Sequence, residues 1–302
     1  MNLKVRIFIF FPEFIKKWVT LMYISYRQVV ESVYASMYNN LKTEIGNGLK
    51  IVYLTGFPRT GTTAMKYYFG ANRRLDINPF DPAGFHVAWK KVRSLSTSRI
   101  LVDKSNHYIK STDLIFRACG EMAALCCIVR DPRDSLLSLL TFPEAREVPR
   151  GLKFWIYWYR NYNTFLEFAE NSKYGSRIYF LRYEDFVTQP VMAKTDYLTW
   201  LGLDTRIEKI ENTYSVPETR EFVYDKVHKQ NTITADSLQR WKKVELPEKT
   251  LRLLQGWREY PCVADLMVQL GYVEGGLTDP TIRPQNFRMF RMRTKSNAVE
   301  LR

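Results

Sequence analysis

Residues 51–64 read IVYLTGFPRTGTTA, and they combine a strand, a tight loop and the start of a helix. Four β-forming residues at 51–54 run into a turn bounded by Gly56 and Gly61, after which a helix is expected to begin at 62–63. Glycine permits the tight turn, and the first amides of a helix have no partner within the helix. Because the helix dipole also favours negative charge there, the stretch predicts an anion-binding loop.

The loop is close to the nucleotide-binding P-loop, G-x-x-x-x-G-K-[ST], but it differs at one position. A lysine follows the second glycine of that motif, whereas Thr62 follows Gly61 here, and the basic residue is Arg59, inside the loop. The pattern predicts a loop that holds a phosphate without a P-loop lysine. Taken alone, it is also compatible with a phosphate loop of another nucleotide enzyme.

The six residues 58–63, PRTGTT, resemble the 5′-phosphosulfate loop of sulfotransferases that use 3′-phosphoadenosine 5′-phosphosulfate (PAPS). Family members read P-[KR]-[ST]-G-T-T there, and the arginine version is common in the tyrosylprotein and carbohydrate branches. The resemblance implies an enzyme that moves a sulfuryl group from PAPS to an acceptor hydroxyl, for example on a carbohydrate or glycolipid. The residues that it implies as contacts of the donor's 5′ end are Arg59, Thr60, Gly61, Thr62 and Thr63.

A second motif lies at residues 123–138, AALCCIVRDPRDSLLS, which read as a buried strand leading into a helix with Asp134 as candidate N-cap. Arg130 ends the strand, and Ser138 follows eight residues later, about two helical turns along. The 3′-phosphate motif of sulfotransferases has the same pair at the same separation. A guanidinium grips phosphate through two prongs and a hydroxyl adds a neutral donor, so both residue types suit this task. The alternative is an Arg–Asp surface pair beside an exposed serine.

A third motif, RILVDK at residues 99–104, is a short apolar strand followed by Ser105. It resembles the [DE]-K-[ST]-P element of the carbohydrate and tyrosylprotein branches, whose lysine contacts the bridging oxygen or the sulfuryl group in transfer. The resemblance therefore implies a catalytic role for Lys104. Asn106 replaces the family's proline, which leaves the turn geometry open, and a solvated lysine at a strand end is the alternative.

Two later segments resemble parts of the family that lie near the nucleotide. Residues 178–190, IYFLRYEDFVTQP, are similar to its L-R-Y-E-D-[LF] strand and turn, which implies that Tyr183 contacts the adenine. Residues 229–272 loosely resemble the segment that closes over the cofactor in the arginine-loop branches, although the R-K-G-x-x-G-D-W signature of the cytosolic branch is absent. Lys229 and Lys242 are candidate phosphate contacts, but they are also ordinary basic surface residues.

Transfer to a hydroxyl needs a base near the attacking oxygen. Residues 79–89, PFDPAGFHVAW, resemble the E-P-x-W-H-V-W stretch of carbohydrate sulfotransferases, with Asp81 in the place of the glutamate. We expect Asp81 to be the general base and His86 to be the second candidate. An aspartate is one methylene shorter than a glutamate, and a capping role in a turn is the alternative for Asp81.

The implied mechanism uses fixed cations and no metal ion. Arg59 and Lys104 would neutralise the charge that builds on the bridging oxygen and the sulfuryl group, as magnesium does in kinases. The three histidines are scattered through the chain and no C-x-x-C pair is present, so the sequence shows no metal-ligand cluster.

The pattern of apolar segments predicts an α/β fold in a single P-loop-like domain. Strand candidates near residues 51, 100, 125 and 178 alternate with helical patterns, which indicates a central parallel sheet flanked by helices on both faces. The aromatic stretch 154–168 has helical spacing and reads as a packed core helix. The expected divisions are an N-terminal helical or amphipathic extension at 1–48, a sulfotransferase-like domain at 49–274 and a basic tail at 275–302.

The formal net charge of +14 indicates anionic partners, and PAPS accounts for part of it. The basic residues are dispersed without a recognition motif, so nucleic acid is not expected. An anionic glycan or an acidic membrane surface stays open, and the acceptor hydroxyl could belong to a carbohydrate, a lipid or a small molecule. Two other classes also stay open: a nucleotide-dependent kinase, and a catalytically silent anion-binding or membrane-associated protein of the same fold.

The N-terminal segment is apolar but interrupted by charges, and no run in it reaches the ~20 apolar residues that span a bilayer. Residues 7–11 are too short for the apolar region of a signal peptide. Residues 13–38 could form an amphipathic helix, either docked on the fold or lying on a membrane. The four cysteines look like small core residues, so we expect a cytoplasmic protein, with peripheral membrane contact through residues 3–38 as the open alternative.

Overall fold

The computed structural model describes residue 36 and residues 48–78, 99–141, 148–149, 151–206, 210–214 and 232–273. Asp81, His86 and Lys229 lie outside the described residues, as do nearly all of the expected N-terminal extension and the basic tail. The predictions that concern them therefore stay predictions.

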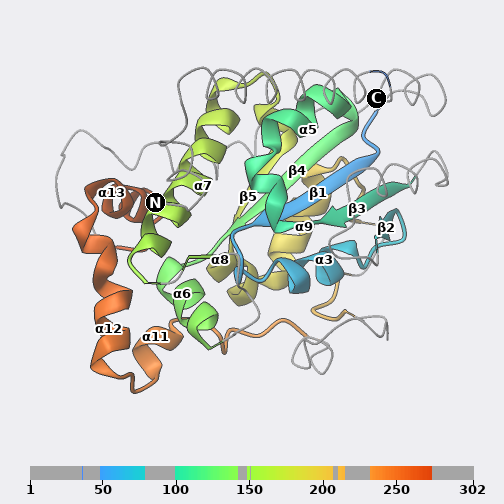
Figure 1. The fold of residues 1–302 in the computed structure, drawn as a ribbon. Coiled ribbons are helices and arrows are strands. Elements are labelled where there is room, and N and C mark those ends of the chain that lie inside the picture. The colour runs from blue at the N-terminus through green and yellow to red at the C-terminus, as the bar shows by residue number, and fades with distance from the viewer. Residues whose placement is uncertain are drawn as a thin grey trace, which may run out of the picture.

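A five-stranded parallel sheet in the order β2-β3-β1-β4-β5 forms the centre of the fold (Figure 1). Its strands are β1 (Ile51–Gly56), β2 (Leu75–Ile77), β3 (Ile100–Lys104), β4 (Ala123–Val129) and β5 (Ile178–Arg182). Every residue of β1, β3 and β4 is buried, as is usual for parallel strands covered on both faces. The four predicted strands are confirmed, while the three-residue β2 was not predicted.

Helices connect the strands and extend the fold at its C-terminal end. The α-helices are α3 (Thr62–Gly70), α5 (Thr112–Cys119), α6 (Pro132–Leu140), α7 (Lys153–Asn171), α8 (Tyr183–Thr188), α9 (Pro190–Trp200), α11 (Arg240–Lys243), α12 (Glu248–Gln255) and α13 (Pro261–Gln269). Short 3₁₀ turns lie at η1 (Asn106–Lys110), η2 (Gly120–Met122), η3 (Gly175–Arg177) and η4 (Gly256–Glu259).

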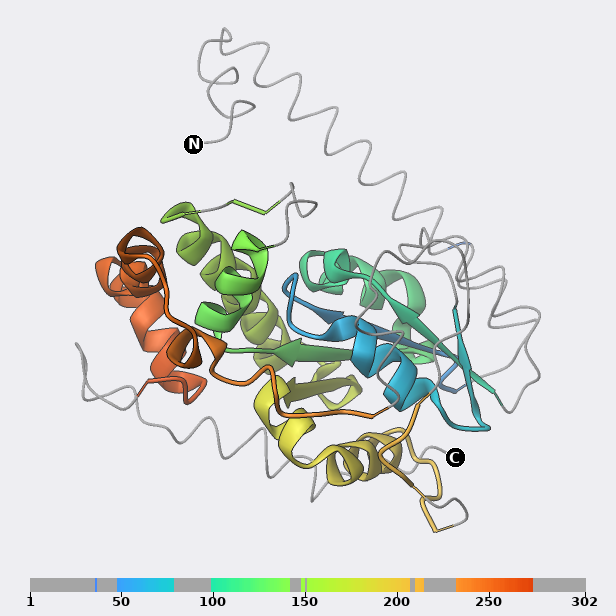
Figure 2. The ribbon, with the colours of Figure 1, turned by 90° about the horizontal axis from the view of Figure 1, so that it is seen from below.

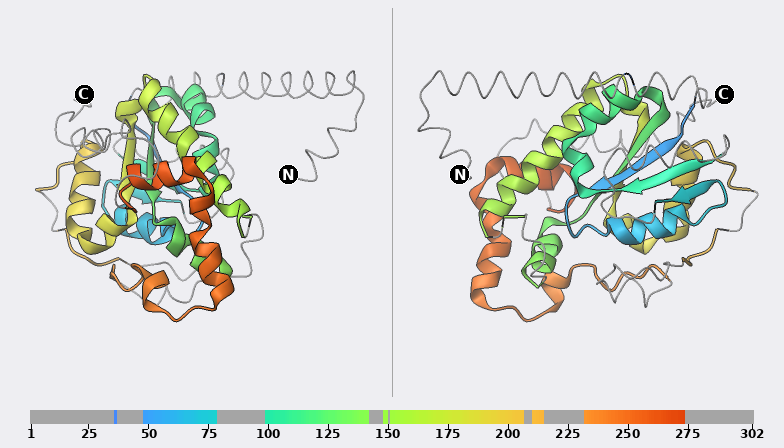
Figure 3. Two further views of the ribbon diagram at one scale, coloured as in Figure 1. Left: turned by 90° about the vertical axis from the view of Figure 1, so that its left-hand side faces the viewer. Right: turned by 45° about the vertical axis from the view of Figure 1, so that its right-hand side comes forward.

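The helices cover both faces of the sheet, which confirms the predicted α/β architecture (Figure 3). Side chains of α5, α6, α7 and α13 form one apolar cluster with one face of the strands, and those of α3, α8 and α9 form another with the opposite face. Neighbouring residues of a strand point to opposite faces, so Cys127 belongs to the first cluster and Cys126 to the second.

The aromatic helix α7 is the main element of the first cluster. Trp155, Trp158 and Tyr162 are fully buried in it, which confirms that this stretch is a core helix. At the C-terminal end, α11 and α12 contact α6, and α13 contacts α7, so these helices stand beside α6 and α7 (Figure 2). Residues 240–269 therefore border the end of the sheet from which α6 begins.

The strand register brings the three motifs of the sequence to one edge of the sheet. Leu54 of β1 lies opposite Lys104 of β3, and Gly56 lies opposite Ile128 of β4. The anion loop, Lys104 and Arg130 therefore follow neighbouring strands at their carboxyl ends. Parallel α/β sheets bind ligands there, and most readily where the strand order reverses, as it does around β1.

Candidate functional site

The loop between β1 and α3 has an unusual backbone. Arg59 has φ 72° and Gly61 has φ 88°, both in the left-handed region. That region suits glycine but is uncommon for arginine, and such strain is typical of functional sites. Gly61 has a second reason to be glycine, because a Cβ there would lie 2.5 Å from Cε2 of Tyr183.

Hydrogen bonds that involve α7 and β4 hold this loop in place. The backbone N–H of Phe57 donates to Tyr162 Oη at 3.0 Å, and that hydroxyl donates to the carbonyl of Ile128 at 2.9 Å. The hydroxyl and the backbone N–H of Thr60 both donate hydrogen bonds to the carbonyl of Phe57, at 2.7 and 3.3 Å. Thr60 thus shapes the turn, and its contact with a donor molecule stays a prediction.

The N-terminus of α3 is suited to an anion. Gly61 is its N-cap and provides no side-chain cap, and the first turn contains no acidic residue. The first backbone N–H groups of a helix have no acceptor within the helix, and the dipole favours negative charge beside them. The amides of Thr62 and Thr63 belong to this first turn, and their contact with a phosphate or sulfuryl group stays a prediction.

The β3 motif meets this loop through Thr62. Its hydroxyl donates to Asn106 Oδ1 at 3.1 Å, and the N–H of Ser105 donates to the carbonyl of Leu54 at 3.1 Å. Lys104, which is 8% exposed, thus lies at the end of β3 immediately beside the loop. Sequence reasoning missed Asn106 as a site residue, although its replacement of the family's proline was a signal.

Asp103 belongs to a buried network behind Lys104. It accepts hydrogen bonds from Asn78 Nδ2 at 2.8 Å and from the hydroxyl of Tyr108, and it is fully buried. Burial raises the pKa of Asp103 above its usual value, while these hydrogen bonds and the charge of Lys66 oppose the rise. The aspartate of the motif therefore fixes the end of β3.

Arg130 connects the second motif to the first. Its Nη1 donates to the carbonyl of Arg59 at 3.2 Å, and its Nη2 donates to the carbonyl of Ser237 at 2.7 Å. The guanidinium lies 4.4 Å from the ring centroid of Tyr183. Its Nε is buried and has no acceptor among the described residues, so one charged donor remains for a ligand.

The side chains of the two phosphate motifs also touch directly. Arg59 Nε donates to Ser138 Oγ at 3.0 Å, and Ser138 is half-buried on α6. The structure therefore gathers Arg59, Thr62, Lys104, Arg130 and Ser138 in one region around the loop. Their predicted contacts with PAPS stay predictions.

The start of α6 differs from the expectation. Asp131 is the N-cap and accepts from the N–H of Arg133 at 2.9 Å, so the prediction that Asp134 caps the helix was wrong. Asp134 instead accepts from the backbone N–H groups of Gln239 and Trp241. Burial is the main cause that raises the pKa of Asp134, and the charge of Arg130 opposes it.

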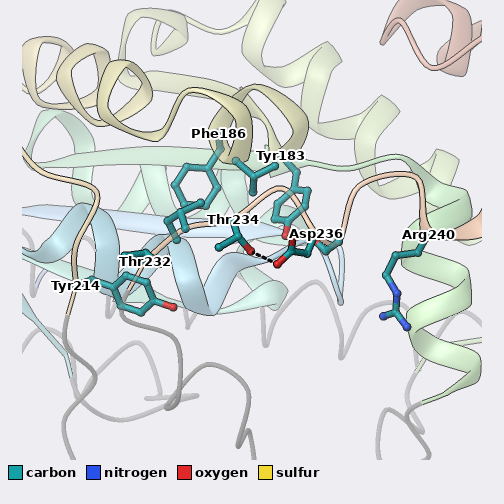
Figure 4. A pocket seen from close by; sticks show the side chains of 10 residues that line it. Tyr183, Phe186, Tyr214, Thr232, Thr234, Asp236 and Arg240 are labelled. Carbon is teal, nitrogen blue, oxygen red and sulfur yellow. Dashed lines mark hydrogen bonds between the residues drawn. The ribbon is translucent and has the colours of Figure 1, made fainter. Parts of the chain in front are cut away.

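A pocket of about 310 Å³ lies beside Tyr183 (Figure 4). Its lining mixes aromatic with polar side chains: Tyr183, Phe186, Val187, Tyr214, Thr232, Ile233, Thr234, Asp236, Ser237 and Arg240. Tyr183 contacts Gly61, Arg130 and Ser237, so the pocket adjoins both phosphate motifs. Its size is at the lower end of the range for small-molecule sites.

The basic residues of the segment 229–272 differ in whether they line this pocket. Arg240 lines it and was not predicted, whereas Lys242 is exposed on α11 with its Nζ 5.2 Å from the ring centroid of Trp241. Glu184 lies in the first turn of α8 and accepts from the N–H of Asp131 at 2.9 Å. Sequence spacing could not show which of several basic residues faces the pocket.

Within the described ranges, no three His, Cys, Asp or Glu side chains come together in a way that could hold a metal ion. No helix in the described part of the chain combines the length and the hydropathy needed to cross a bilayer.

Comparison with known proteins points to one family. Residues 73–206 match the family model described as "Sulfotransferase family". The match includes the β3 motif, the Arg130–Ser138 motif and Tyr183, but it begins after the loop at 58–63. It agrees with the expected class of enzyme, and it does not test the branch that the loop suggested.

Solved structures agree with the fold. The sulfotransferase domain from the Synechococcus PCC 7002 olefin synthase superposes with a TM-score of 0.51 at 17% identity, covering 70% of this chain and 95% of that one. The sulfotransferase domain from the curacin biosynthetic pathway gives a TM-score of 0.50 at 18% identity, covering 68% and 96%. At these identities the likeness shows the fold alone. No curated protein matches the chain significantly.

Proposed function

Since residues 73–206 match a model of the sulfotransferase family, we propose that this chain transfers a sulfuryl group from PAPS to the hydroxyl of an acceptor. One observation carries the choice of donor: Arg130 joins the two phosphate motifs, because it binds the carbonyl of Arg59 and lies over Tyr183 beside the pocket. A molecule with an anionic group at each end and an aromatic base suits such an arrangement.

Each part of PAPS has a suitable partner in this arrangement. The uncapped N-terminus of α3, with Thr62 and Thr63, would hold the 5′-phosphosulfate. The buried Nε of Arg130 and the hydroxyl of Ser138 would hold the 3′-phosphate. The adenine would occupy the pocket that Tyr183 lines.

In the proposed reaction, the acceptor oxygen attacks sulfur in line while the bond from sulfur to the bridging oxygen breaks. The products are the sulfated acceptor and 3′-phosphoadenosine 5′-phosphate (PAP), and the acceptor's proton goes to a base, for which Asp81 and then His86 are the candidates. Lys104 and Arg59 would stabilise the negative charge that grows on the bridging oxygen, because fixed charges cost no reorganisation during the reaction.

Calorimetry with PAP and adenosine 5′-phosphate tests the donor assignment, because the two nucleotides differ only in the 3′-phosphate. We expect PAP to bind at least about tenfold more tightly, the effect of one charge-assisted hydrogen bond or more. Arg130→Ala should remove most of this preference. The matched control is Arg117→Ala, which removes an arginine from an exposed ion pair with Asp113 on α5. Equal affinity of the wild-type protein for both nucleotides would refute the proposed donor.

The acceptor is proposed only as a hydroxyl compound: a carbohydrate, a lipid or a small molecule. Incubation with radiolabelled PAPS and cell extract, followed by identification of the labelled product, would give its class. Tight binding of PAP without turnover on a broad acceptor panel would instead indicate a catalytically silent member of the family. A magnesium-dependent reaction with ATP, and none with PAPS, would indicate a kinase.

A further inference from the structure

The segment of residues 232–241, which we call the strap, forms much of the nucleotide pocket. Six of the ten residues that line the pocket belong to the strap. Of the other four, three lie on α8 and the fourth is Tyr214. The strap is built of bends and turns until α11 begins at Arg240. An irregular segment has no ladder of backbone hydrogen bonds, so other parts of the protein must hold it in place.

The side chain of Asp134 holds the end of the strap. Its carboxylate, 1% exposed, accepts from the backbone N–H of Gln239 at 2.8 Å through Oδ2 and from that of Trp241 at 3.3 Å through Oδ1. Gln239 has φ 51°, a left-handed conformation that a residue with a side chain keeps only when its surroundings enforce it. The carboxylate binds the backbone N–H of this same residue.

Two arginines beside Asp134 hold the strap at other points. Arg130 donates to the carbonyl of Ser237 at 2.7 Å, and Arg133 lies 4.2 Å from the ring centroid of Trp241. Beyond these contacts, the hydroxyl of Ser237 lies 2.5 Å from that of Tyr183. The strap is thus attached to the start of α6 at one side and to Tyr183 at the other.

The geometry fits Asp134 as a counter-ion of Arg130 less well than it fits Asp134 as an acceptor for the strap amides. The nearest approach of the two charged groups is 3.9 Å, between Arg130 Nη2 and Asp134 Oδ2, which is too long for a hydrogen bond. The same oxygen is 2.8 Å from the N–H of Gln239. The shorter contacts of the carboxylate go to the strap.

We propose that Asp134 is a positioning residue for the donor nucleotide: it fixes the strap against Tyr183 and so completes the wall of the pocket. This inference rests on the proposed function, since it gives the pocket to the donor. Asp134 touches no reacting atom, and its effect reaches the donor through Ser237, Arg240 and the rest of the strap.

The variant Asp134→Asn tests the proposal with little change in volume. An asparagine has one acceptor oxygen in place of two, so one of the two strap amides would face an NH₂ group. Hydrogen–deuterium exchange should then speed up at least about tenfold at the amides of Gln239 and Trp241, because a local opening becomes easier. The Kd for PAP should rise about tenfold, the cost of one hydrogen bond to a charged group, while kcat at saturating PAPS should stay near the wild-type value.

Asp103→Asn is the matched control. Asp103 is likewise buried and accepts two side-chain hydrogen bonds, from Asn78 and Tyr108, but neither comes from the strap. This variant should leave exchange at Gln239 and Trp241 unchanged. Equal exchange in Asp134→Asn and wild type, or a loss of kcat without a change in PAP affinity, would refute the proposed role.

A measurement on the wild-type protein covers the case in which Asp134→Asn does not fold. Binding and strap closure are linked equilibria, so PAP should slow exchange at the amides of Gln239 and Trp241. Exchange that is the same with and without saturating PAP would overturn the proposal.

If the wild-type protein does not bind PAP at all, the proposed function fails, whereas the exchange of Asp134→Asn without nucleotide still shows whether Asp134 holds the strap.

Discussion

Arg59 and Ser138 are 79 residues apart in sequence, yet Arg59 Nε donates a hydrogen bond to Ser138 Oγ at 3.0 Å. The contact arises because β1 and β4 pair directly, so that the loop after β1 lies beside α6, which follows β4. The two residues were assigned to opposite ends of the donor. A serine hydroxyl can accept one hydrogen bond and donate another, so Ser138 can orient Arg59 and still contact a phosphate.

Ser138→Ala should weaken the binding of PAP about tenfold, because one hydrogen bond to a charged phosphate is lost. Binding of adenosine 5′-phosphate should change less, since it lacks the 3′-phosphate. Calorimetry with both nucleotides measures this difference. Ser135→Ala is the control, because Ser135 lies on the same helix and its hydroxyl has no partner among the described residues. An equal effect on both nucleotides would contradict the assignment of Ser138.

Lys104→Ala should lower kcat by about 100-fold, the size of effect seen when one group that stabilises developing charge is removed. The affinity for PAP should fall less, because the charge on the bridging oxygen grows mainly in the transition state. Steady-state kinetics and calorimetry separate the two effects. Lys110→Ala, which removes an exposed lysine beside Tyr157 in the next turn, is the control. A normal turnover in Lys104→Ala would show that Lys104 has no catalytic role.

Gly61→Ala should lower both the melting temperature and the affinity for PAP. Its φ of 88° costs an alanine about 1–2 kcal/mol, and the new methyl would lie 2.5 Å from the ring of Tyr183. Gly48→Ala separates the cost of the backbone conformation from the cost of the clash with Tyr183. Gly48 also has a positive φ, of 110°, but a methyl there would meet no atom of the described residues within 4 Å. Thermal unfolding and calorimetry should show a larger loss for Gly61→Ala. Equal losses would mean that the contact with Tyr183 is unimportant.

Asp103→Asn should change how stability depends on pH. Burial raises the pKa of Asp103 in the folded state, so the folded protein retains this proton to a higher pH than the unfolded chain. The stability from this group is complete below its ordinary pKa, about 4, and is lost as the pH rises through the raised value.

An asparagine does not titrate in this range, so the free energy of unfolding of Asp103→Asn relative to wild type should increase with pH over that window. Its amide can still accept from Asn78 and donate to the hydroxyl of Tyr108, so the fold should survive. Urea unfolding at several pH values measures the difference, and a difference that does not vary with pH would contradict the prediction.

The sequence predicted elements whose signal is local. The strand before Gly56, the strand before Arg130 and the aromatic helix α7 each have a long apolar pattern, and all three are confirmed. The strand β2, at Leu75–Ile77, was missed because three residues are too few to show a period. The cap of α6 was assigned to Asp134 in place of Asp131, since boundaries differ by a few residues from any pattern.

Some of the residues that the structure gathers around the loop could be picked out from the sequence, and others could not. Arg59, Arg130 and Ser138 belong to short motifs, so their residue types and spacing could be read directly. Asn106 and Arg240 belong to no motif, and their places follow from contacts with distant parts of the chain. No local pattern records such contacts.

The sequence by itself determined that this chain forms a parallel α/β sheet and that two loops suited to phosphate follow its strands. Apolar runs and glycine positions encode these features, because they depend on neighbouring residues only. The tertiary structure alone decided that Arg59 meets Ser138, that Asp134 binds the amides of Gln239 and Trp241, and that the strap lines the pocket. These contacts join residues far apart in the chain, and they exist only once the strand order and register have set the distances between them.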